Sequence, residues 1–193
     1  RVLYDWIKDD KESMVKINLD DMARKIVKEY EKLTNETVKE WNSPGYPSIK
    51  LTKPEHEDEI YKQEEYRSMV GKVMYLVNKS NSICLNAVRE LAKHFINPTK
   101  QHWKALMQLI GYIKSDIGKD KILRKPKELR LITFTDSDYT NDEDRKSITG
   151  GVVTLGGSPK YFTSKMHATV SLSSTEAEYI ALGTVTQEVL FQA

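Results

Sequence analysis

Cysteine is almost missing from this chain of 193 residues, because Cys84 is its single cysteine and no disulfide can form within the chain. Such low cysteine usage favours a reducing, intracellular setting. Long hydrophobic runs are missing too, and no apolar stretch approaches the roughly 20 residues of a membrane-spanning helix. The sequence starts at Arg1 without an initiator methionine or a signal-peptide pattern. We therefore expect an internal segment of a longer intracellular protein that does not enter a membrane.

A strong excess of one charge is also lacking. Thirty Lys and Arg residues face 28 Asp and Glu residues, which gives a formal net charge of +2. This balance neither requires nor excludes a nucleic-acid partner, because phosphate contacts depend on local clusters of basic side chains. Hydrophobic residues make up 39% of the chain. That share and the length are enough for one large domain or two small ones.

Three common kinds of site have no support in the sequence. The histidines show no metal-ligand spacing, and no second cysteine accompanies them, so zinc is not expected; they are His56, His94, His102 and His167. The glycine pairs at 150–151 and 156–157 lack the strand–glycine–helix context of a phosphate-binding loop. Ser173 and Ser174 have no base and orienting group beside them, so a nucleophilic triad is not indicated.

The N-terminal part combines a hairpin with helices. Alternating apolar residues predict a β-hairpin over residues 1–18, and three- and four-residue spacing predicts a helix over residues 19–33. A break at 42–47 begins a polar loop that extends to about residue 65. Three further amphipathic helices are expected, with apolar stripes at 66–77, 84–95 and 103–113. Their short connections favour antiparallel packing.

Local signals refine these helices. Asn97 and Pro98 match the N-cap and first position of the third of them, and Gly118 marks its end. Cys84 and the methionines of the stripes occupy apolar positions, which predicts that they belong to the core rather than to a ligand set. His94 and His102 fall on or beside helical faces, and we expect structural roles for them.

A basic segment follows from residue 119 to residue 130 and is the predicted boundary between two units. It contains Pro126 and only two acidic residues beside the basic residues Lys119, Lys121, Arg124, Lys125, Lys127 and Arg130. The segment can be read as a linker that contacts nucleic-acid phosphates or as a solvated tether, and the sequence favours neither interpretation.

The C-terminal part predicts a small sheet and one helix. Strands are expected over residues 128–135, 147–155 and 160–165, with a turn at 156–159 and a helix over residues 173–191. The expected fold class is therefore α+β, with an N-terminal hairpin and helical region at 1–118, a basic linker at 119–130, and a sheet with a packed helix at 131–193.

Acidic residues at two places could act together. Asp136 and Asp138 lie two apart at a strand end, so their side chains share one side of the strand and could face a cation, although aspartates also commonly form turns there. Glu176 and Glu178 lie two apart at a helix start and diverge by roughly 200°, so only one can share a site with Asp136. Both also fit a helix-capping box with Ser173 or Thr175.

Two charged groups surround these positions. The acidic loop 142–144 is most simply solvated. Arg145 and Lys146 follow it at the same end of the expected sheet. They could contact nucleic-acid phosphates or neutralise the loop, and both interpretations stay open.

Collinear phrases in the chain resemble copia-type retrotransposon Pol polyproteins. They are residues 66–76 (YRSMVGKVMYL), 97–106 (NPTKQHWKAL), 144–151 (DRKSITGG) with 164–165 (SK), and 171–182 (SLSSTEAEYIAL). The hairpin at 1–18 and the helix at 19–33 are similar, with a weaker sequence match, to the end of a reverse transcriptase palm leading into its thumb. The resemblance implies thumb and connection helices followed by the first half of a ribonuclease H domain with a mixed sheet.

The family implies an activity and its cofactor. Its ribonuclease H cuts the RNA strand of an RNA–DNA hybrid with two Mg²⁺ ions, or alternatively Mn²⁺, held by carboxylates. Carried over by position, Asp136 is the first-strand ligand and Glu176 the helix ligand. The hybrid, contacted through its backbone and 2′-hydroxyls, and the remainder of the polyprotein are the implied partners. The family also implies a cytoplasmic virus-like particle or the nucleus as the location.

The chain departs from the family pattern at both ends and within the match. The polymerase aspartates would lie before Arg1, and the later ribonuclease H ligands beyond Ala193. Residues 78–82 (NKSNS) replace a usual Pro-Asp pair. Two carboxylates cannot fill two octahedral Mg²⁺ shells. We therefore expect an enzyme as the parent and little or no activity for this chain; the alternative is a degenerate or co-opted nucleic-acid- or protein-binding module. We also expect an unpaired apolar edge at 129–135, which favours oligomers.

Overall fold

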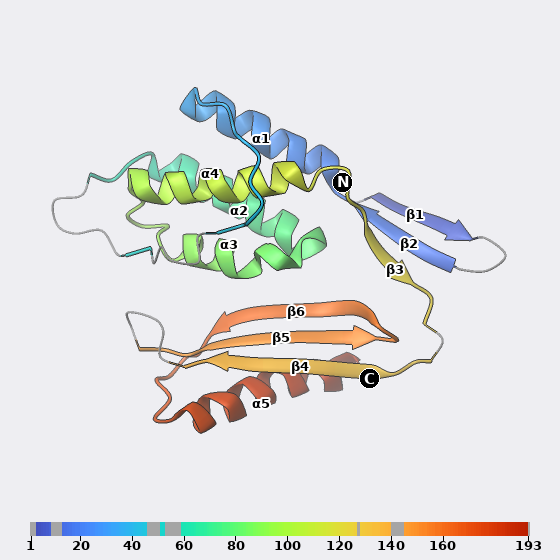
Figure 1. Cartoon of the computed structure of the whole chain (residues 1–193). Helices are drawn as coiled ribbons and strands as arrows, with labels where there is room; N and C mark the ends of the chain where they lie inside the picture. The colour runs from blue at the N-terminus through green and yellow to red at the C-terminus, as the bar shows by residue number, and fades with distance from the viewer. Residues whose placement is uncertain are drawn as a thin grey trace. The chain divides into compact units, whose positions relative to one another are not determined.

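The computed structural model describes residues 3–8, 13–45, 51–52, 59–126, 128–139 and 145–192, and confirms the α+β class. It divides the chain into two units (Figure 1): Arg1–Asp5 with Lys16–Lys121, and Trp6–Val15 with Ile122–Ala193. This division crosses the basic segment 119–130 and also assigns the tip of the N-terminal hairpin to the second unit. None of the helices in the described ranges is long and apolar enough to cross a membrane.

A first three-stranded sheet contains the predicted hairpin and one unexpected strand. Its order is β1 (Leu3–Lys8), β2 (Ser13–Asn18) and β3 (Lys121–Arg124). The Lys125 N–H donates to the Ser13 carbonyl at 2.8 Å, and the Asn18 amide donates to Asp120 at 2.9 Å, so β3 runs antiparallel to β2. We expected only a linker here, because four residues rich in Lys and Arg carry no clear alternation.

Four α-helices and a short 3₁₀ turn form the first unit around one core. They are α1 (Asp20–Thr34), α2 (Gln63–Ser80), the turn Ser82–Cys84, α3 (Leu85–Ala92) and α4 (Lys100–Ser115). The stripes predicted from the sequence are buried, Cys84 included, and burial raises the pKa of the Cys84 thiol to about 12. Rings of Tyr30, Tyr61 and Tyr66 surround Trp103, whose indole N–H donates to the Tyr61 carbonyl at 3.0 Å.

The start of α4 differs from the prediction. Thr99, not Asn97, is the N-cap, and its extended backbone (φ −109°, ψ 174°) precedes Lys100. The Thr99 N–H donates to Nδ1 of His102 at 2.9 Å, which forms a capping box with histidine in place of the usual glutamate. The ring of His102 also stacks on His94 with 3.9 Å between centroids, so both histidines have the structural roles that we expected.

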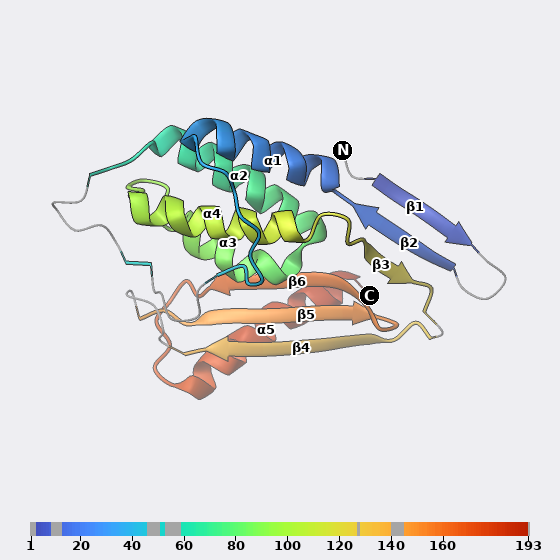
Figure 2. The ribbon, with the colours of Figure 1, turned by 45° about the horizontal axis from the view of Figure 1, so that its top comes forward.

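The second unit holds the predicted meander and its helix. The sheet contains β4 (Leu131–Asp138), β5 (Ile148–Leu155) and β6 (Ser158–Met166) in that order, with both pairings antiparallel. β4 starts later than expected and continues through both aspartates. The helix α5 (Ser174–Gln192) covers one face of this sheet (Figure 2) and buries Ala177, Ala181 and Val185.

Candidate functional site

The candidate site lies at the end of the second sheet where β4 and β6 terminate and the chain turns into α5 (Figure 1). His167 follows β6, and its Nε2 lies 2.8 Å from Thr149 Oγ1, while its Nδ1 lies 3.4 Å from Ser171 Oγ. Thr149 is the cross-strand partner of Ser137, which stands between the two aspartates. The contacts of His167 therefore hold the segment that leads into α5 at the end of the sheet that carries Asp136 and Asp138.

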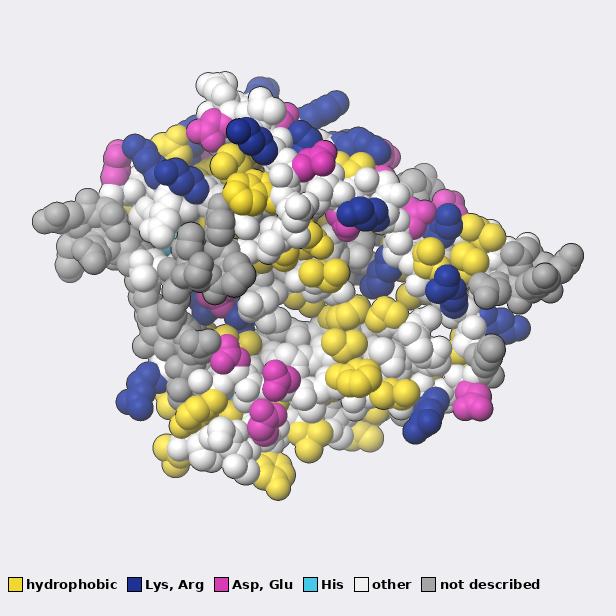
Figure 3. Space-filling model, in the orientation of Figure 1, with side chains coloured by type: hydrophobic (Ala, Val, Ile, Leu, Met, Phe, Trp, Pro, Cys, Tyr) yellow, Lys and Arg dark blue, Asp and Glu magenta, His cyan; other side chains and the backbone are white. Residues whose placement is uncertain are grey.

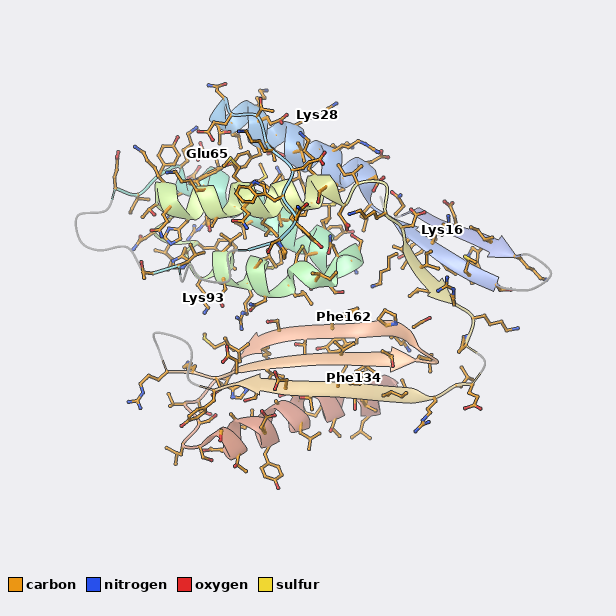
Figure 4. The ribbon with its side chains drawn as sticks, in the orientation of Figure 1. Lys16, Lys28, Glu65, Lys93, Phe134 and Phe162 are labelled. Carbon is orange, nitrogen blue, oxygen red and sulfur yellow. The ribbon has the colours of Figure 1, made fainter. Side chains whose placement is uncertain are left out.

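The sheet register decides which face each aspartate occupies. A Cβ placed on Gly151 would lie 2.5 Å from Val185 Cγ2, so position 151 faces α5. Its partner Thr135 faces α5 as well, and alternation puts Asp136 on the opposite face, together with Phe134. Phe134 projects from β4 in Figure 4. Asp136 is exposed on this face.

Glu176 takes part in the start of its own helix. Its Oε2 accepts a hydrogen bond from the Leu172 N–H at 2.6 Å, and its N–H donates to Ser173 Oγ at 3.1 Å. The pattern Ser173-x-x-Glu176 predicts this capping box from the sequence. The one difference is that Glu176 accepts from the N–H of Leu172 rather than from that of Ser173. A carboxylate in the first turn also complements the helix dipole. One oxygen of Glu176 is thus already engaged by the backbone.

The described carboxylates do not by themselves fit a Mg²⁺ pair. Within residues 3–8, 13–45, 51–52, 59–126, 128–139 and 145–192, no group of three or more His, Cys, Asp or Glu side chains is placed to hold a metal ion. The acidic loop 142–144 lies outside the described residues. Asp136 lies on the sheet face opposite to α5, and one oxygen of Glu176 already accepts the Leu172 N–H, whereas Mg²⁺ demands a nearly octahedral oxygen shell. Their role as metal ligands stays a prediction.

A buried polar cluster occupies the helix side of the same end, and our sequence reasoning missed it. His167, Thr149 and Ser171 are each at least 95% buried. Burial lowers the pKa of the His167 imidazole below its ordinary value of 6.5. The hydroxyls of Thr135 and Ser137 are buried nearby without a hydrogen-bond partner in the described part of the chain. The only sequence signal was a histidine between a strand and a serine-rich helix start.

The basic residues that we considered for nucleic-acid binding do not form one patch. Lys119 is paired with Asp116 at 3.4 Å in the first unit. Lys121 is half-buried, which lowers the pKa of its ammonium group. The Arg124 N–H donates to Ser158 Oγ at 3.1 Å, so Arg124 lies beside the β5–β6 turn, and Lys125 follows it as an exposed side chain. Lys127 lies outside the described residues.

Arg145 and Lys146 stand at the other end of that sheet. They precede β5 directly, and the first residue of β5 pairs with Asp138 at the end of β4. Arg145 is exposed and has a positive φ of 55°. Figure 3 shows acidic side chains gathered at this end of the sheet. Arg124 and Lys125 therefore lie at one end of the second unit, and Arg145 and Lys146 at the acidic end.

Comparison with known proteins gives relatives that include an effector protein and transposon polyproteins. The chain is 34% identical over 131 residues to the secreted RxLR effector protein 161 of Plasmopara viticola, which covers 67% of this chain and 92% of the effector. It is 34% identical over 127 residues to the retrovirus-related Pol polyprotein from transposon TNT 1-94 of Nicotiana tabacum, and 32% identical over 145 residues to the corresponding polyprotein from transposon RE1 of Arabidopsis thaliana.

The extent of these matches differs. The matches to the two transposon polyproteins span 65% and 75% of this chain but only 10% and 9% of the polyproteins. No protein-family model matches the chain, and no solved structure matches it. The chain is therefore related to retrovirus-related Pol polyproteins of plant retrotransposons over about a tenth of their length, and to the effector over nearly the effector's whole length.

Proposed function

We propose that the chain derives from the reverse transcriptase and ribonuclease H region of a copia-type Pol polyprotein, and that it binds RNA–DNA hybrid without cleaving it by itself. The parent ribonuclease H would hydrolyse the RNA strand with two Mg²⁺ ions. Support comes from the relationship to retrotransposon Pol proteins and from the meander of β4, β5 and β6 followed by α5.

One observation carries the lack of cleavage. Asp136 lies on the face of β4 opposite to the one that α5 covers, and Glu176 accepts the Leu172 N–H. Two-metal hydrolysis needs carboxylate oxygens that face the same pair of cations, about 4 Å apart. In the chain as described, Asp136 would contribute an exposed anionic oxygen, and Glu176 would stabilise the helix start. Binding of a hybrid would depend on Arg and Lys contacts with phosphates, which need no divalent ion.

A hydrolysis assay tests the first half of the proposal. The whole chain is incubated with an end-labelled RNA–DNA hybrid in Mg²⁺ and, separately, in Mn²⁺. We expect no cleavage above that of the Asp136→Asn variant. Efficient cleavage by the unaltered chain that disappears in Asp136→Asn would overturn the proposal, because it would mean that the available carboxylates assemble a working metal site.

A binding titration tests the second half. Hybrid affinity is measured at two salt concentrations, with and without Mg²⁺. We expect affinity that falls with salt and is independent of Mg²⁺. The double variant Arg145→Gln/Lys146→Gln should bind more weakly, whereas the matched control Lys119→Gln, at a lysine already paired with Asp116, should change little. Absence of salt-dependent binding would contradict the nucleic-acid role.

A second candidate is a co-opted protein-binding module. It is favoured by the effector of Plasmopara viticola, which this chain matches over 92% of the effector's length, so that a protein of nearly this extent occurs separately from a polyprotein. Under this alternative the chain would neither cleave nor bind the hybrid. Absence of both cleavage and salt-dependent hybrid binding, in a chain that circular dichroism shows to be folded, would favour this alternative.

A further inference from the structure

The outer face of α1 carries a row of lysines. Lys25, Lys28 and Lys32 follow one another at three- and four-residue steps, and their side chains are exposed. At 3.6 residues per turn these positions fall within a sector of about 60° and span about 10 Å along the helix axis. Figure 4 shows Lys28 on α1. These residues form the lysine row. The opposite side of the helix is buried in the core through Ala23, Ile26, Val27 and Tyr30.

The two glutamates of α1 bind partners outside this row. Glu29 stands one helical turn after Lys25, a spacing at which an ion pair on the helix surface would be expected. Instead, its carboxylate accepts a hydrogen bond from the Lys72 ammonium group of α2 at 2.5 Å. The carboxylate of Glu31 accepts the Val38 N–H at 3.0 Å. Tertiary contacts thus engage both carboxylates, and neither of them neutralises the lysine row.

The aspartates in the first turn of α1 are engaged as well. Asp20 and Asp21 both pair with Arg24, at 3.5 and 3.6 Å. The ammonium groups of the lysine row, in contrast, have no ion pair or hydrogen bond with any residue that the structure describes. Lys32 stands in the last turn, where a cation complements the helix dipole, but the dipole does not explain the other two lysines. This face therefore keeps a local excess of positive charge.

The chemistry of this face favours a phosphate backbone as its partner. A helix that lies on a membrane inserts an apolar side into the lipid, whereas α1 buries its apolar side in the core of the first unit. A nucleic-acid duplex carries one negative charge per about 1.7 Å of its axis, so a row of about 10 Å meets several phosphates at once. The regular spacing of the lysines along one line matches such a continuous row of charge.

We propose that the lysine row binds the sugar–phosphate backbone of a nucleic-acid duplex, and that it does so independently of base sequence. The inference rests on the proposed hybrid binding and extends it to a surface of the first unit, apart from Arg145 and Lys146 in the second. Lysine ammonium groups bind phosphates as point charges, and contacts with phosphates carry no sequence information. An RNA–DNA hybrid and a DNA duplex of equal length should therefore depend on the row to a similar extent.

Removal of the three charges tests the row. The affinity of the whole chain for a labelled RNA–DNA hybrid, and for a DNA duplex of equal length, is measured at several salt concentrations. The triple variant Lys25→Gln/Lys28→Gln/Lys32→Gln should bind both duplexes roughly tenfold or more weakly at low salt. Its slope of log affinity against log salt should be shallower by roughly 2 to 3, because each lost phosphate contact releases about one counterion fewer.

A second triple variant is the matched control. Lys16→Gln/Lys93→Gln/Lys119→Gln removes the same net charge from the first unit, but each of these lysines is already paired with an acidic residue, at 3.4, 3.0 and 3.4 Å. Its salt slope should stay close to that of the unaltered chain. Circular dichroism verifies that both triple variants are folded.

A variant that should bind more tightly excludes a folding defect as the cause. Glu29→Gln removes a carboxylate beside the lysine row and releases the Lys72 ammonium group, so hybrid affinity at low salt should rise severalfold. Unchanged or weaker binding by Glu29→Gln would overturn the proposal, as would equal losses of affinity in the two triple variants.

Further outcomes separate this inference from the proposed function. A chain that binds the hybrid, and is weakened by Arg145→Gln/Lys146→Gln but not by the triple variant of the row, would overturn the inference alone. A chain that binds no hybrid would overturn both. Binding to phosphatidylserine vesicles that depends on the row, with hybrid binding that does not, would assign the row to a membrane surface and would also overturn the proposal.

Discussion

Val185 of α5 lies against Gly151 at the centre of β5 so closely that a Cβ on Gly151 would be only 2.5 Å from Val185 Cγ2 and 3.0 Å from Thr163 Cγ2. This approach brings the helix onto the sheet and shows which face of each strand it covers. It also places Asp136 on the other face. A glycine in the middle of a strand is explained here by the close packing of a neighbouring helix.

Replacing this glycine should loosen the second unit. Gly151→Ala is expected to lower the free energy of unfolding by about 1–3 kcal/mol, because the added methyl group pushes Val185 away. Gly150→Ala is the matched control, since its Cβ would meet only the Asp136 carbonyl oxygen at 3.8 Å, an ordinary contact. Urea denaturation followed by circular dichroism measures both. Equal effects of the two variants would contradict the inferred helix position, and Val185→Ala should partly rescue Gly151→Ala.

A similar pair of glycines tests the first unit. A Cβ on Gly111 would overlap the Lys39 carbonyl oxygen and lie 2.5 Å from Trp41 Cδ1, and the Trp41 N–H donates to the Gly111 carbonyl at 3.3 Å. Gly111→Ala should therefore cost about 2 kcal/mol or more, since a backbone atom cannot yield easily. Gly71 is exposed in α2 with no neighbour within 4 Å, so Gly71→Ala should stabilise the protein by up to about 1 kcal/mol. Thermal unfolding should show a lower melting temperature for Gly111→Ala and a higher one for Gly71→Ala.

The cap of α5 is open to measurement as well. Ser173→Ala removes the acceptor of the Glu176 N–H, and should lower the free energy of unfolding by about 1 kcal/mol. Glu176→Gln should cost less, because an amide oxygen can still accept from Leu172 but loses its charge near the helix dipole. Glu178→Gln, at an exposed neighbour, is the control and should be nearly neutral. A Glu176→Gln variant as stable as Glu178→Gln would argue against the cap.

His167 should make the stability of the second unit sensitive to acid. Burial lowers the pKa of its imidazole in the folded protein, so below about pH 6.5 the unfolded chain binds the proton more readily than the folded chain. Stability contributed by neutral His167 is thus present above that pH and decreases as pH falls. His167→Gln cannot be protonated, so it should flatten the decrease between pH 7 and pH 5. The urea unfolding midpoints of the unaltered chain and of His167→Gln are measured at several pH values. The same decrease of the midpoint with falling pH in both proteins would contradict the prediction.

Some elements were predictable because their signals are local. The stripe at 66–77 encodes α2 by its helical spacing, and the glycine turn after β5 indicates the meander. Other features depend on partners distant in the sequence. Thr99 became the cap of α4 because His102 accepts its N–H, although Asn97 and Pro98 match the usual start pattern. The strand β3 forms only because β2 offers it an edge.

The candidate site shows the same division. Its residues, Asp136 at the end of a strand and Glu176 at the start of a helix, could be named from the sequence, since turn and cap positions are marked by nearby residues. By itself the sequence also determined the α+β class and the relationship to retrotransposon Pol proteins. Only the tertiary structure decided that Asp136 faces away from α5, that Glu176 binds the backbone and that His167 joins sheet to helix. Strand register and helix position decide these, because they depend on packing between segments far apart in the chain.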